Sequence, residues 1–151
     1  MNTAAIRVGR LLEIRALAYR NAGDVTALFK AVGAELSKVA LTTQIVTVTD
    51  WRYCPLLGSE AAEVALAGMT KNNARVLRSG ALASHDSPIA VLQFLRLVRE
   101  SKNESRRLFF DEGELMRWLG EVLTDAENAR LLEFLHEPVE RQRPTKGSPP
   151  R

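Results

Sequence analysis

The stretch RRLFFDEGELMRWLGEVL, from Arg106 to Leu123, indicates most clearly how this chain folds. Its opening residues, 106–110, are typical of a short strand, because apolar and aromatic residues favour strands. Asp111 is followed three residues later by Glu114, a spacing that resembles a capping box at a helix start. An apolar stripe at helical spacing comes next: Leu115, Trp118, Leu119 and Val122. The stretch therefore predicts a last strand followed by a helix that packs on a sheet.

The rest of the chain alternates strands with helices. The segment from Ile6 to Leu17 partly alternates apolar and polar residues, which indicates a bent strand or a hairpin around Gly9-Arg10. Residues 45–49 are β-branched almost throughout and predict a buried strand, while residues 75–83 predict a weaker one. Capping residues mark the other helix starts: Asp24, Ser59, Ser87-Pro88, and Thr124 with Glu127. This order predicts a single α/β domain with a parallel or mixed sheet.

We expect the domain to span residues 1–137 and a disordered, Pro-rich basic tail to span residues 138–151. A chain of 151 residues suits one core, and the tail holds four of the six prolines without apolar periodicity. The helix from Ile89 to Val98 is apolar on more than one face, so it is either sandwiched in the core or meets a partner; we favour the core. The expected core residues are Val46, Val48, Leu92, Leu95, Phe109, Trp118 and Leu119.

Composition and charge exclude several classes of protein. The net charge of +3 is mild, and the basic residues are interleaved with acids, which favours a solvated surface over a nucleic-acid site. The single cysteine, Cys54, cannot form an internal disulfide, so we expect a cytoplasmic protein. Arginines interrupt the apolar stretch at the amino terminus, unlike an export signal. No segment approaches the roughly 18 apolar residues that span a bilayer, so we expect no membrane insertion.

Groups suited to catalysis are few. Cys54, His85 and Asp86 are the only candidates for a nucleophile with a base, and nothing in their spacing brings His85 to Cys54. A structural cysteine is therefore favoured. His136 lies near the end of the last helix, where it is expected to complement the helix dipole. Because metal-ligand spacing and a glycine-rich phosphate loop are both missing, we predict a protein that is not an enzyme and has no metal or cofactor.

The ending of the chain resembles the SpoIIAA-like STAS family. That ending has an Arg-x-Phe strand, an acidic turn and a helix with Ala-x-x-Trp-Leu; here the matching residues are Arg107, Phe109, Asp111 and Trp118-Leu119, with Leu115 in place of Ala. The match covers Ile6 to Leu123. It implies a four- or five-stranded mixed sheet with packed helices, and a regulatory role. Some members of the family are suspected of binding lipids or other apolar ligands.

Classical STAS antagonists carry a phosphorylatable Ser after an Asp at the end of a central strand. Asp50 stands at such a strand end here, but Trp51, Arg52, Tyr53 and Cys54 follow it, and the nearest helix-capping Ser is Ser59. The resemblance therefore makes Ser59 a possible phosphorylation site, at a different spacing from the family's.

The best candidate for a binding surface is the loop Asp50, Trp51, Arg52 and Tyr53. Binding loops gather at the carboxyl ends of strands, and Trp, Tyr and Arg are enriched in interface hot spots. In the alternative interpretation, Trp51 covers the sheet edge and Asp50 caps the turn. We predict a regulatory module that binds an unidentified protein partner, in an oligomeric state that the sequence does not indicate. The alternative is a carrier or sensor of a small apolar ligand or lipid, held in a pocket beside the helix Ile89–Val98.

Overall fold

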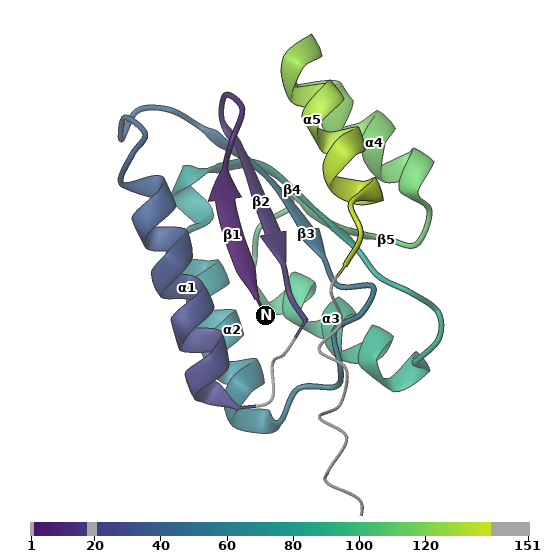
Figure 1. Ribbon diagram of the computed structural model, residues 1–151. Helices are drawn as coiled ribbons and strands as arrows, with labels where there is room; N and C mark the ends of the chain where they lie inside the picture. The colour runs from purple at the N-terminus through teal and green to yellow at the C-terminus, as the bar shows by residue number, and fades with distance from the viewer. Residues whose placement is uncertain (1, 18–20, 140–151) are drawn as a thin grey trace, which may run out of the picture.

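A five-stranded sheet in the order β1-β2-β3-β4-β5 forms the centre of the computed structural model, which describes residues 2–17 and 21–139 (Figure 1). In chain order the elements are β1 (Thr3–Ile6), β2 (Leu11–Arg15), α1 (Ala22–Leu36), β3 (Ile45–Asp50), α2 (Ser59–Lys71), a 3₁₀ turn (Asn73–Arg75), β4 (Val76–Leu82), α3 (Pro88–Glu100), β5 (Arg106–Phe109), α4 (Glu112–Gly120) and α5 (Asp125–His136).

The sheet is mixed. β1 pairs with β2 in antiparallel fashion, and β2, β3, β4 and β5 are parallel. Of the bent strand and the hairpin that the sequence left open, the structure has the hairpin, and Gly9 in its turn has a φ of +58°, a conformation that glycine adopts at little cost. The α/β class and the mixed sheet of the prediction are confirmed, and the arrangement is compatible with a STAS-like fold.

Helices cover both faces of the sheet, and alternate residues of β3 point to opposite layers. Ile45 packs with residues of β2 and α1, whereas Val46 and Val48 pack with the leucines of α4 and α5. Helices α1, α2 and α3 lie on the first face and α4 and α5 on the second, as Figure 1 shows. The domain therefore has three layers, with one apolar core on each side of the sheet.

Some of the observed helix N-caps agree with the sequence prediction and others do not. The N-cap of α1 is Asn21, whose Oδ1 accepts a hydrogen bond of 2.9 Å from the backbone N–H of Asp24, so the predicted cap at Asp24 is wrong by three residues. Gly58 caps α2 without a side-chain bond, and Ser59 is its first residue rather than its cap. The remaining caps are confirmed: Ser87, Asp111, and Thr124 with Glu127 in a capping box.

The predicted core is wrong in α3. Leu92 is 67% exposed and Leu95 is 44% exposed, because the helix buries the opposite side through Ala90, Phe94 and Leu97. The helix thus has apolar residues both in the core and on the surface. The core positions predicted in β3 are confirmed, since Val46 and Val48 are fully buried.

The helix predicted within residues 106–123 is confirmed, but its predicted core residues are not all fully buried. Leu119 is fully buried against the sheet. Trp118 is half-buried and packs on the half-buried Phe109, with 5.5 Å between ring centroids. The guanidinium groups of Arg78 and Arg107 each lie within 5 Å of the indole ring centre. Trp118 therefore closes the edge of the core rather than filling its centre.

None of the helices within the described residues is long and apolar enough to cross a membrane. The predicted tail, 138–151, lies outside the described residues from position 140 onward.

Candidate functional site

Asp50 is the centre of a buried ion-pair cluster at the carboxyl end of β3. Its side chain is completely buried and accepts a hydrogen bond of 2.9 Å from Nη1 of Arg15 on β2. The backbone N–H and the Nε of Arg52 each donate to the carboxylate at 3.0 Å. Although burial opposes its charge, the hydrogen bond to Asp50 raises the pKa of the Arg52 guanidinium above its ordinary value.

The same two arginines hold the end of α5. Arg15 donates to the carbonyl of Phe134 at 2.8 Å, and Arg52 donates to the carbonyl of Leu135 at 2.9 Å. The last carbonyls of a helix have no partner within it, and cations there complement the helix dipole. Asp50 therefore fastens α5 to the sheet through its two arginines.

The other residues of the predicted binding loop separate into buried and exposed positions. Trp51 is 6% exposed and stacks on Phe94 of α3, with ring centroids 4.6 Å apart. Tyr53 is 37% exposed, and the Arg52 guanidinium lies 5.5 Å from its ring centre. Asp50 and Trp51 thus lie inside the protein, and Tyr53 with part of Arg52 is what the loop presents to a partner. Partner binding by this loop stays a prediction.

Ser59 lies on the surface at the first position of α2. A phosphate there would meet the positive end of the helix dipole. Phosphorylation of Ser59 stays a prediction.

The thiol of Cys54 and the imidazoles of His85 and His136 contact different groups. Cys54 is buried, and that burial, together with the charge of Asp50, raises the pKa of its thiol to about 12. His85 stacks on Phe110 with ring centroids 4.3 Å apart, and His136 pairs with Glu112 of α4. Within residues 2–17 and 21–139, no cluster of three or more His, Cys, Asp or Glu side chains is placed to hold a metal ion.

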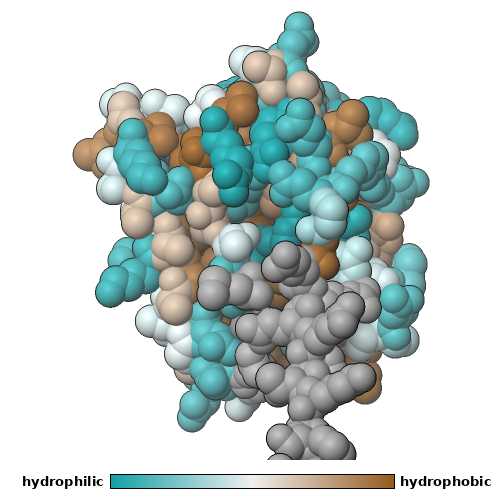
Figure 2. Space-filling view, in the orientation of Figure 1, coloured by the Kyte–Doolittle hydropathy of each residue, from teal (hydrophilic) through white to brown (hydrophobic). Residues whose placement is uncertain are grey.

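An exposed apolar surface, here named the α3 face, consists of Leu56, Ile89, Leu92 and Leu95. These side chains are between 44% and 67% exposed. The side-chain amide of Gln93 on α3 bonds both the N–H and the carbonyl of Leu57, at 2.8 and 2.9 Å, so the loop that carries Leu56 is tied to α3. In Figure 2 the surface over α4 and α5, at the upper right, is mostly hydrophilic. The sequence signal for the α3 face was the excess of apolar residues in the helix.

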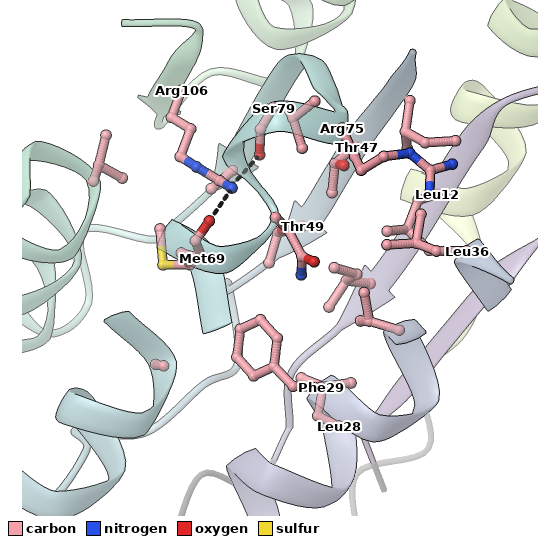
Figure 3. Close-up of a pocket in the computed structure, with 18 of the residues that line it drawn as sticks. Leu12, Leu28, Phe29, Leu36, Thr47, Thr49, Met69, Arg75, Ser79 and Arg106 are labelled. Carbon is pink, nitrogen blue, oxygen red and sulfur yellow. Dashed lines mark hydrogen bonds between the residues drawn. The ribbon is translucent and has the colours of Figure 1, made fainter. Parts of the chain in front are cut away.

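A cavity of about 50 Å³ lies between the sheet and the helices α1 and α2, several times the roughly 10–15 Å³ that one water needs. In Figure 3, Leu28 and Phe29 of α1 lie on one side, and Arg75, Ser79 and Arg106 lie on the other. Val98 is the one α3 residue in the lining, so the cavity differs from the pocket predicted beside that helix.

No protein-family model, curated protein or solved structure matches this chain. The likeness to STAS proteins therefore remains a resemblance, supported by the ending motif and a compatible fold.

Proposed function

We propose that this protein is a non-enzymatic regulatory module that binds a partner protein through the α3 face. The observation that carries the proposal is the cluster of exposed apolar side chains, Ile89, Leu92 and Leu95, on a single helix, with Leu56 on the loop bonded to it. Contiguous exposed apolar patches are uncommon on monomeric proteins and mark interaction sites. By contrast, Leu41 is 84% exposed but stands alone in the loop between α1 and β3.

The charges beside this surface indicate the chemistry of the partner. Arg96 and Arg99 are exposed on the same helix. Arg96 is already paired with Glu100 at 2.9 Å, so a partner that places apolar side chains on Leu92 and a carboxylate near Arg99 would complement this surface. Tyr53 is exposed on the loop that also carries Leu56, and it is a residue type common in hot spots.

A regulatory rather than catalytic role is supported by the environment of the only cysteine. The raised pKa of Cys54 keeps the thiol protonated at neutral pH, which removes its value as a nucleophile. The same single cysteine favours a reducing, cytoplasmic location.

Affinity capture with matched surface variants tests this function. Leu92→Ser removes the centre of the α3 face, and Leu132→Ser removes a leucine of α5 that is 44% exposed on the other side of the sheet. We expect the wild type and Leu132→Ser to capture equal amounts of a partner protein, and Leu92→Ser to capture about a tenth of that amount or less. Equal capture by all three would contradict the proposal. Both variants should keep the wild-type melting temperature, because the replaced side chains are exposed.

A further inference from the structure

The sheet ends in two edge strands, β1 and β5, whose outward backbone groups are bonded differently. At the β1 edge, α1 runs beside the strand, and the backbone N–H of Ile6 donates to Oε2 of Glu35 on that helix at 2.8 Å (Figure 1). An unpaired edge is a template for a further strand, and a side chain that takes up its donors makes it a poorer one. The protein therefore blocks part of the β1 edge itself.

The outer edge of β5 has no such bonds. The carbonyls of Ser105 and Phe109 accept hydrogen bonds of 2.8 and 2.9 Å from the β4 side, so the odd-numbered residues face β4. The backbone groups of Leu108 and the N–H of Phe110 therefore point away from the sheet. In the part of the chain that the structure describes, no hydrogen bond uses these groups. They remain available to another strand.

The charges along β5 run from basic to acidic. Arg106 and Arg107 begin the strand, and Asp111 follows it in an extended conformation, with φ of −109° and ψ of 121°. Arg107 and Asp111 are both exposed, and their even spacing places them on one side of the strand. Both capping bonds of Asp111 to the backbone of α4 are accepted by Oδ1. A strand with this order of charges is complementary to a copy of itself that runs in the opposite direction.

We propose that two copies of this chain pair through β5 as antiparallel strands related by a two-fold axis at Leu108. The two Leu108 residues would exchange N–H···O bonds, and each Phe110 N–H would donate to the Arg106 carbonyl of the second copy. The N–H of Arg106 already donates to the carbonyl of Asn103 at 3.0 Å, so this register uses the groups that the fold leaves open.

The same register brings opposite charges together. Arg107 of each copy would lie diagonally across from Asp111 of the other, a separation that a long side chain spans. Parallel pairing in register would instead bring the two Arg107 side chains together. Because β5 has only four residues, the contact is small and the dimer should be weak and reversible. None of these residues belongs to the α3 face, so the dimer does not rest on the proposed partner binding.

Sedimentation equilibrium of the full-length protein tests the dimer. Over about a hundredfold range of concentration, the mean mass should rise from that of one chain toward that of two. Arg107→Glu places like charges across the pair and should raise the dissociation constant about tenfold or more, and Asp111→Lys should do the same. An equal mixture of these two variants should dimerise again, because the substituted positions then face each other with opposite charges. The control is Lys30→Glu, the same change of charge on an exposed residue of α1, which should leave the dissociation constant unchanged.

Hydrogen exchange of the wild type locates the contact without a variant. The amides of Leu108 and Phe110 should gain protection as the concentration rises and the dimer forms. Circular dichroism establishes that each variant is folded, since Asp111→Lys also removes the N-cap of α4. A protein that stays monomeric at every concentration would overturn the proposal. So would a folded Arg107→Glu protein that dimerises as tightly as the wild type, or a dimer in which the Leu108 amide exchanges as fast as in the monomer.

Discussion

Replacing Asp50 with Asn tests whether the ion-pair cluster around Asp50 holds α5 against the sheet. The substitution keeps the size of the side chain but removes the charge that binds Arg15 and Arg52. Those arginines would still contact the carbonyls of Phe134 and Leu135, but without a buried counter-charge. Breaking a buried pair from one side typically costs about 3–5 kcal/mol of the free energy of unfolding.

The expected loss lies near the lower end of that range, about 3 kcal/mol. Glu137 lies 3.6 Å from Nη2 of Arg15, so this arginine still has one carboxylate partner after Asp50 is replaced by Asn. Urea denaturation measures the free energy of unfolding, and hydrogen exchange should show the amides of α5 losing protection before those of β3. The matched control is Glu100→Gln, which breaks the exposed i,i+4 pair with Arg96 and should cost about 0.5 kcal/mol or less. If Asp50→Asn were no more destabilising than this control, the fastening role would be refuted.

Three further outcomes follow from burial and charge. Leu119→Ala should lower the free energy of unfolding by about 2–5 kcal/mol, Trp118→Ala by about 2 kcal/mol because its ring is only half-buried, and Leu92→Ala by under about 0.5 kcal/mol. Urea denaturation measures the three losses, and the reverse order would contradict the observed packing. Burial would raise the pKa of Glu127, but hydrogen bonds from the backbone N–H groups of Arg10 and Thr124 outweigh it and hold the pKa below its ordinary value of 4.5. The stability advantage over Glu127→Gln should therefore be complete at neutral pH and shrink as the pH falls below about 4.5, and a constant difference down to pH 2 would argue against it. Cys54 should react with iodoacetamide at pH 8 about a hundredfold or more slowly in the folded protein than in urea, and similar rates in both would show that the thiol is accessible.

The strands and helices were predictable because their signals are local. The β-branched run at 45–49 and the Thr124–Glu127 capping box specify their own conformation through neighbouring residues. The cap of α1 was placed wrongly because Asn21 and Asp24 both suit the role, and only the observed backbone turn decides between them. Local sequence thus identifies the elements better than it identifies their first residues.

The burial of polar residues was not predictable in the same way. Glu13 and Arg15 alternate with apolar residues in β2, a pattern typical of a strand with one solvated face. In the structure they are 3% and 7% exposed, because α5 covers that face and supplies Arg130 as a partner for Glu13. The partner is 117 residues away in the chain. No local pattern carries that information.

The same difference between local and long-range information applies to the candidate site. The exposed position of Tyr53 agrees with a binding loop, whereas Trp51 is buried by a stack on Phe94, which the sequence separates by 43 positions. The cavity was missed because its lining comes from segments far apart in the chain, from Leu12 on β2 to Arg106 on β5. The apolar excess in α3 was recognised, but the core positions predicted at Leu92 and Leu95 were wrong, whereas Phe94 and Leu97 of the same helix are buried.

Site-specific photo-crosslinking in cells tests the proposed partner interaction most directly. A photo-reactive amino acid at position 92 reports what touches the centre of the α3 face, and the same group at position 132 reports on the surface of α5. We expect a discrete crosslinked protein from position 92 that is absent from position 132 and is lost when Ile89→Ser is combined with the probe. Identical crosslinking from both positions, or crosslinks from position 92 only to a second copy of this chain, would contradict a partner-binding role for the α3 face.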